Sequence, residues 1–128
     1  MADWWQWSQK REKEALTFAV VGVGRFGTAV CRELISNGAD VLAADYSEKA
    51  IDDLRQLEPS IEARVVDCTD EESMKESGIL EMNTVVVGIS EPIEASITTT
   101  LIAKDSEGSK VKRVIARATS DLHEKMLK

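Results

Sequence analysis

Short apolar runs alternate with amphipathic segments along the chain from residue 16 onward. The apolar runs predict strands, and the segments between them carry apolar residues at helical spacing and predict helices. Strands that are apolar throughout and separated by helices are typical of a parallel sheet covered on both faces. The sequence therefore predicts an α/β fold with a doubly wound parallel sheet of about five strands, in the order 3-2-1-4-5. The expected strands are 17–22, 40–45, 62–67, 84–89 and 112–117, and the expected helices lie near 25–37, 48–57, 70–77, 91–105 and 120–127.

Capping residues mark the ends of most of these helices. A hydroxyl residue followed by acids favours a helix start, because the hydroxyl accepts a bond from a backbone N–H and the acids face the positive end of the dipole. Gly38 and Gly78 each follow a helix, where glycine readily adopts the left-handed conformation that ends it. The expected capping residues are Ser47, Thr69, Ser90 and Ser120, and residues 69–72 match the capping-box pattern.

A glycine-rich turn separates the first apolar run from the first helix. Gly22, Gly24 and Gly27 have the G-x-G-x-x-G spacing, which suits a tight turn, a close approach of pyrophosphate to bare backbone, and close helix–strand packing. The helix N-terminus adds unpaired N–H groups that attract an anion. Asp45 ends the second apolar run, where its carboxylate can accept bonds from ribose hydroxyls. The motif predicts a Rossmann-like nucleotide-binding fold, and a purely structural glycine turn is the alternative.

Arg25 occupies the first turn of the helix that follows the glycine turn. A cation there faces the positive end of the helix dipole, which costs a few tenths of a kcal/mol to about 1 kcal/mol unless an anion is nearby. No acid precedes Glu33 in this helix, whereas the other expected helices begin with acids. We interpret Arg25 as a phosphate ligand. A solvated surface arginine is the alternative, and it predicts that Arg25→Ala leaves nucleotide affinity unchanged.

The carboxyl ends of the other strands supply further candidates, because ligands of doubly wound sheets bind there, beside the reversal of strand order. Asp67 and Cys68 lie where a base edge could be read, although a plain strand-to-helix connection capped by Thr69 also explains them. Arg117 suits phosphate contact and a salt bridge equally well. His123 is the single histidine, and a lone histidine more often packs or lies on the surface. The remaining candidates at these ends are Ile89, Ser90, Glu91, Ala118 and Thr119.

Composition excludes several classes of protein. The 128 residues are enough for one domain with a core. A formal charge of −7 disfavours a nucleic acid partner. No apolar run is long enough to span a membrane, and the N-terminus lacks the apolar region of a secretory signal. Cys31 and Cys68 form no C-x-x-C motif, so we expect a reducing cytoplasm.

Residues 1–15 differ from the rest and are expected to form a Trp-rich tail, separate from a domain at residues 16–128. Trp4, Trp5 and Trp7 are the three tryptophans of the whole chain. Their rings, each with a polar tip, suit a protein interface or a membrane–water boundary. Docking on a partner, disorder and membrane contact are the alternatives. Membrane contact is the weakest, because the basic residues between 10 and 13 are offset by acids.

No residue pattern in the sequence indicates catalysis. Tyr46 is the single tyrosine, and neither a Tyr-x-x-x-Lys pair, a Ser-His-Asp set nor a metal-ligand cluster is evident. The threonines at 98–100 need no ligand, since a threonine can bond to its own helix. We expect a nucleotide sensor rather than an enzyme, and a natural protein that continues beyond Lys128. A fragment of an NAD-dependent oxidoreductase and a dimerisation module with an unused cleft are the rival hypotheses.

Five segments resemble, in order, the nucleotide-binding domain of the RCK or KTN (TrkA-N) family of potassium-transport regulators, which includes the cytoplasmic subunits of bacterial Ktr and Trk uptake systems. The resemblance implies a regulator that binds ATP and ADP, or NAD and NADH. It also implies homodimers that assemble into octameric rings at the inner face of the cell membrane, beneath a membrane-embedded potassium-translocating subunit. The segments are 18–27, 41–45, 66–70, 85–89 and 115–118 with His123, so the resemblance covers about residues 16–128.

Residue roles also follow from the resemblance. Arg25 would reach the terminal phosphates, residues 45–47 would hold the ribose, and residues 67–68 would flank the adenine. Residues 89–91 and the residues after the fifth strand would line the cleft. The implied site comprises Gly22, Gly24, Arg25, Phe26, Gly27, Asp45, Tyr46, Ser47, Asp67, Cys68, Ile89, Ser90, Glu91, Arg117, Ala118, Thr119 and His123.

The sequence departs from the family pattern in two respects. Glu91 stands where many relatives carry a small or neutral residue, and an acid near phosphates weakens their binding. The sixth strand and the regulatory lobe of the family would lie beyond Lys128. We expect a switch in which ADP lacks a charge-assisted bond to Arg25, worth about 1.5–3 kcal/mol or one to two decades in population. Asp45 argues against NADP, whose 2′-phosphate it would repel.

Overall fold

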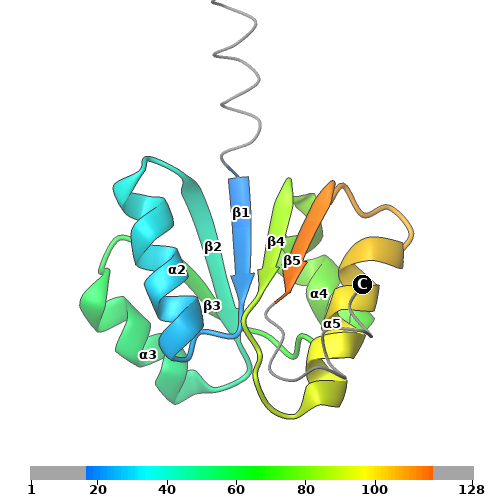
Figure 1. Cartoon of the computed structure of the whole chain (residues 1–128), viewed down its shortest axis with the longest axis horizontal. Coiled ribbons are helices and arrows are strands. Elements are labelled where there is room, and N and C mark those ends of the chain that lie inside the picture. The colour runs from blue at the N-terminus through cyan, green and yellow to red at the C-terminus, as the bar shows by residue number, and fades with distance from the viewer. Residues whose placement is uncertain (1–16, 117–128) are drawn as a thin grey trace, which may run out of the picture.

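The computed structural model describes residues 17–116 and contains one parallel sheet of five strands in the order β3-β2-β1-β4-β5 (Figure 1). This order confirms the prediction from the hydrophobic pattern. The Trp-rich tail, the expected helix at 120–127 and the four candidates from Arg117 to His123 lie outside the described residues. The strands are β1 (Thr17–Val21), β2 (Asp40–Asp45), β3 (Glu62–Val65), β4 (Thr84–Val87) and β5 (Arg113–Ala116).

Four α-helices and one short 3₁₀ helix connect the described strands. The four helices predicted within the described residues are present with boundaries shifted by at most two residues, and the 3₁₀ helix η1 was not predicted from the pattern. Within residues 17–116, no helix is long and apolar enough to cross a membrane. The helices are α2 (Arg25–Ser36), α3 (Glu48–Leu57), α4 (Glu71–Ser77), η1 (Ile79–Glu81) and α5 (Ile93–Asp105).

Helices cover both faces of the sheet because alternate residues of each strand point to opposite sides. Val20 of β1 joins a core cluster with Cys31 of α2 and Ile51 of α3. Its neighbour Val21 joins the opposite cluster, which includes Met74 of α4 and also a residue of α5. The central strands are therefore buried on both faces, which explains why they are apolar throughout.

Two expected capping residues were wrong. The α4 helix begins after Asp70, whose carboxylate accepts a bond from the Ser73 N–H at 3.1 Å, so Thr69 is not the cap. The hydroxyl of Thr69 donates instead to Asp67 Oδ1 at 2.6 Å. The Asp70 carboxylate, one residue further along the chain, takes the capping role expected of the Thr69 hydroxyl. Both groups are good acceptors at an N-cap.

The other wrong cap is at α5, where Pro92 holds the N-cap position without a side-chain bond. Ser90 therefore stays in the loop after β4. Ser47 caps α3 through the Ala50 N–H, as predicted, whereas the expected cap Ser120 lies outside the described residues. Gly38 and Gly78 have φ angles of 84° and 92°, as expected of residues that end a helix.

Candidate functional site

The glycines after β1 differ in whether a side chain would fit at their position. Gly22 has φ of 90°, and a Cβ there would lie 2.8 Å from the backbone nitrogen of Ile89. A Cβ on Gly27 would overlap the carbonyl oxygen of Gly22, so α2 can pack here only without a side chain. A Cβ on Gly24 would meet nothing within 4 Å. Gly22 and Gly27 are thus required by the fold, whereas Gly24 presents bare backbone to open space.

Gly88 completes the close approach of the two central strand ends, and it was not among the predicted site residues. Its N–H donates to the Val21 carbonyl at 2.7 Å. A Cβ on Gly88 would lie 2.7 Å from the Gly22 carbonyl oxygen and 3.4 Å from a ring carbon of Phe26. The sequence signal for this role is a glycine directly after the apolar run at 84–87.

Asp45 connects the glycine turn to the loop after β2. Its Oδ2 accepts a bond from the Val23 N–H and its Oδ1 accepts one from the Ser47 N–H, both at 2.8 Å. A carboxylate has about four acceptor sites, so two remain for ligand hydroxyls. Ser47 itself is committed to capping α3 and does not line the cleft. Asp45 therefore shapes the site as well as offering acceptors.

A cleft of about 680 Å³ opens at the carboxyl ends of the strands, where the lower ends of the arrows converge in Figure 1. It lies beside the reversal of strand order between β1 and β4, as the rule for doubly wound sheets requires. Val65, Thr69, Gly88, Pro92 and Ala95 also line it although the sequence did not indicate them as ligands. The predicted residues that line it are Gly22, Gly24, Asp45, Tyr46, Asp67, Cys68, Ile89, Ser90 and Glu91.

Arg25 and Phe26 adjoin this cleft in sequence but do not line it. Arg25 is exposed, and it forms no ion pair with any residue in the range 17–116. The first turn of α2 contains no acid, whereas α3, α4 and α5 each have at least one. Phe26 packs against the core on the α2 side of the sheet. Phe26 is thus a packing residue, and Arg25 is a cation beside the cleft that has no counter-charge among the described residues.

Asp67 and Cys68 differ in charge state although they are adjacent. The hydroxyl and the N–H of Thr69 both donate to Asp67 Oδ1, and these bonds lower the pKa of the Asp67 carboxyl. Burial raises the pKa of the Cys68 thiol to about 12, with smaller contributions from the charges of Asp45 and Asp67. At neutral pH the cleft therefore presents an ionised carboxylate beside an uncharged thiol.

The electrostatics of the cleft constrain its ligand. Asp45, Asp67 and Glu91 line it, and none of the described lining residues is a lysine or an arginine. Across residues 17–116, no group of three acids, cysteines or histidines is close enough to hold a metal ion. An anion in the cleft would therefore depend on backbone N–H groups, on the dipole of α2 and on Arg25 at its N-terminus.

The sequence has relatives among known proteins. The TrkA-N domain family matches residues 18–128. Ktr system potassium uptake protein C from Bacillus subtilis is 38% identical over 110 residues, which cover 86% of this chain and 48% of that protein. Ktr system potassium uptake protein A from Vibrio alginolyticus is 40% identical over 89 residues, which cover 70% of this chain and 40% of that protein. The chain thus spans about half the length of these relatives, or less.

Solved structures share the fold. The TrkA-N domain of inner membrane protein ybaL from Escherichia coli superimposes with a TM-score of 0.72 at 21% identity, over 88% of this chain and 80% of that one. The NAD(P)-binding domain of an exopolyphosphatase-related protein from Archaeoglobus fulgidus gives 0.70 at 22% identity, over 87% and 80%. At these identities the similarity establishes the fold alone.

Proposed function

Because the chain belongs to the TrkA-N domain family, we propose that it is the nucleotide-binding domain of a regulatory subunit that controls potassium uptake. The relatives named Ktr system potassium uptake proteins support the role in potassium transport. The proposal places an adenine nucleotide, either ATP and ADP or NAD and NADH, in the cleft at the carboxyl ends of the strands. The domain senses the nucleotide and does not convert it.

One observation carries this proposal: the open space over Gly24 lies in a cleft whose neighbouring glycines are fixed by packing. Gly24 is the N-cap of α2, and an added Cβ there would meet nothing within 4 Å, so a ligand has room to approach its backbone. In the proposed complex the pyrophosphate contacts this turn, and Asp45 accepts bonds from the ribose. Tyr46 and Val65 are exposed apolar side chains in the same cleft and suit the face of a base.

The proposed partner is a membrane-embedded potassium-translocating subunit. The domain would act at the inner face of the membrane, as a homodimer that assembles into an octameric ring. Nucleotide binding shifts such an assembly only through different affinities for its two conformations. Arg25 supplies that difference if it bonds to the third phosphate, because a charge-assisted bond of about 1.5–3 kcal/mol changes a population by one to two decades.

Calorimetric titration of the 128-residue chain with ATP, ADP, NADH and NADPH tests the proposal. We expect binding of one adenine nucleotide pair, weaker binding of NADPH because Asp45 repels a 2′-phosphate, and no consumption of ligand. NADH binding accompanied by hydride exchange would favour the rival oxidoreductase fragment. Absence of binding by all four ligands would favour a dimerisation module and would contradict the proposal.

A further inference from the structure

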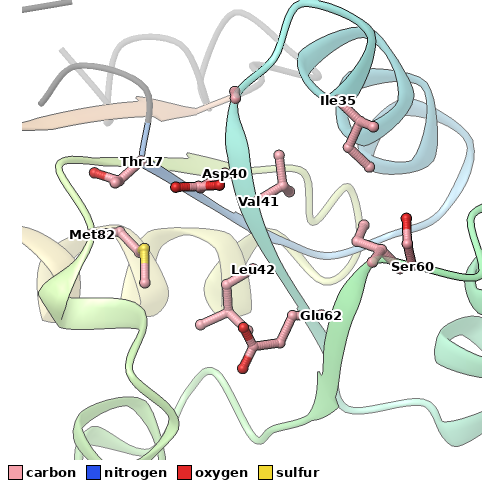
Figure 2. Close-up of a pocket in the computed structure, with 10 residues that line it drawn as sticks. Thr17, Ile35, Asp40, Val41, Leu42, Ser60, Glu62 and Met82 are labelled. Carbon is pink, nitrogen blue, oxygen red and sulfur yellow. The ribbon is translucent and has the colours of Figure 1, made fainter. Parts of the chain in front are cut away.

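A second hollow, of about 450 Å³, lies at the amino-terminal ends of the strands, at the opposite edge of the sheet from the nucleotide cleft (Figure 2). It surrounds the first residues of β2. Its apolar lining comes from α2, β2 and the segment after η1, and its rim carries hydroxyl and carboxylate groups. The apolar residues in Figure 2 are Ile35, Val41, Leu42 and Met82, and the polar ones are Thr17, Asp40, Ser60 and Glu62.

The hollow reaches both faces of the sheet. Val41 packs with the core cluster under α2 and α3, whereas Leu42 belongs to the cluster under α4 and α5. Figure 2 shows these two side chains on opposite sides of β2, with Ile35 on the side of Val41. An occupant that fits this shape needs two apolar groups that straddle the strand.

The rim offers hydrogen-bond acceptors to such an occupant. Asp40 is exposed, and its carboxylate bonds to no residue in the range 17–116. Glu62 pairs with Arg64 at 2.7 Å through one oxygen and keeps further acceptor sites. The matching side chain is large and apolar with one N–H donor and no acceptor, which describes the indole of tryptophan.

The chain itself supplies this side chain next to the hollow. Residues 1–16 lead directly into Thr17, which lines the hollow, and they contain all three tryptophans. Trp4 and Trp5 are neighbours, and neighbouring side chains of an extended segment point to opposite sides. About a dozen residues separate Trp5 from Thr17, and their extended reach of roughly 40 Å is ample for a return to the hollow.

We propose that the segment of residues 1–16 folds back onto this edge of its own domain, with Trp4 and Trp5 on the two sides of β2. The indole N–H groups bond to carboxylates of the rim, and the sulfur of Met82 contacts an aromatic ring. The proposed contact lies within one chain, and the proposal does not depend on the proposed nucleotide site.

Tryptophan fluorescence of the full chain tests this assignment, because every tryptophan lies in the segment. We expect blue-shifted emission and protection from acrylamide, both independent of protein concentration. Ile35→Glu places a charge in the hollow. Ser60→Arg places a large side chain at its rim. Because Ser60 is exposed, this second variant keeps the test valid if the first one folds poorly. Each should restore water-like emission and raise the quenching constant about twofold. The matched control is Leu101→Glu, at an exposed residue of α5 that does not line the hollow.

Three results would overturn the assignment. Water-like emission of the unaltered chain would show that the indoles stay in solvent. Protection that survives both hollow variants, or that Leu101→Glu also removes, would place the indoles elsewhere. Protection that appears only at high concentration would indicate contact with a second copy.

Discussion

At the scale of single residues, the glycines of one motif have separable roles. Gly27 has no room for a side chain, because a Cβ would overlap the Gly22 carbonyl oxygen of the preceding turn. A Cβ on Gly24 would meet nothing within 4 Å, and its φ of −73° is one that any residue can adopt. The G-x-G-x-x-G spacing alone does not distinguish a glycine that the fold requires from one that the ligand requires. The structure shows that packing requires a glycine at Gly27 and not at Gly24.

Alanine substitutions should separate these roles in a stability measurement. Gly27→Ala should lower the free energy of unfolding by at least about 2 kcal/mol, because backbone atoms must move to relieve the overlap. Gly24→Ala should lower it by less than about 1 kcal/mol, the difference between glycine and alanine at an N-cap. Denaturant unfolding gives both values, and similar losses for the two variants would refute the assignment.

Arg25 is the second residue with a specific prediction. Arg25→Gln should weaken ATP binding by about tenfold to a hundredfold, because the substitution removes the cation at the start of α2 and with it the proposed bond to the terminal phosphate. The loss for ADP should be smaller. Arg32→Gln is the matched control, since Arg32 lies on the same helix but pairs with Glu58 at 3.3 Å. Equal ATP affinity of the two variants in calorimetry would leave Arg25 as a solvated surface residue.

At the scale of elements, the hydrophobic pattern predicted the strands and helices because burial on both faces leaves a strong signal. The ends of the strands were less predictable. The β4 strand stops at Val87, two residues early, because Gly88 bonds to Val21 and the chain then turns toward α5. The cap at Asp70 was missed because Thr69 fits the same sequence signal, and only the bond from Thr69 to Asp67 excludes it.

The α5 helix is bonded through one buried hydroxyl to the loop after β3, which contributes Cys68 to the cleft. Thr100 bonds back to the Ser96 carbonyl of its own helix, as the sequence led us to expect. Thr99 instead donates to the Cys68 carbonyl at 2.9 Å and is fully buried. A hydroxyl that crosses to another element cannot be distinguished by sequence from one that bonds within its helix.

Thr99→Val should therefore affect both stability and binding. The substitution leaves the buried Cys68 carbonyl without this donor, which should cost about 1–3 kcal/mol of unfolding free energy. Nucleotide affinity should fall as well, because the loop that carries Asp67 loses its attachment. Thr98→Val on the exposed side of α5 is the control and should change neither quantity. A wild-type affinity for Thr99→Val would show that α5 does not position the cleft.

At the scale of the whole molecule, the core makes stability sensitive to alkaline pH. Burial raises the pKa of the Cys31 thiol from 9.0 to about 12, with a smaller contribution from Glu58, and burial raises that of Cys68 equally. Between pH 9.0 and about 12 the folded chain retains protons that the unfolded chain loses. The free energy of unfolding should therefore fall as pH rises above 9.0.

Each cysteine should contribute a slope of up to about 1.4 kcal/mol per pH unit in that window. Urea unfolding at a series of pH values measures the slope. The double variant Cys31→Ala and Cys68→Ala should be less stable at pH 7 because of the lost packing, but its slope above pH 9 should be smaller. The same slope in the wild type and in the double variant would refute the role of the thiols.

The site as a whole was only partly predictable. Asp45, Asp67 and Glu91 could be assigned to one cleft because parallel strands end at one edge of the sheet. Pro92 and Ala95 could not, because their place in the cleft depends on how the loop after β4 enters α5. The ligand could not be identified from the sequence, because its recognition depends on how charges are arranged in space. Among the described residues, the cleft presents mainly acidic side chains and backbone groups.

The central claim is that a nucleotide phosphate contacts the backbone at Gly24, and calorimetric titration of two isosteric variants tests it most directly. Asn and Asp both suit this N-cap and the space around it, so Gly24→Asn and Gly24→Asp should fold equally well. They differ by one negative charge. With ATP, Gly24→Asp should bind at least about a hundredfold more weakly than Gly24→Asn, because like charges at close range repel strongly. Equal ATP affinity of the two variants would contradict the account.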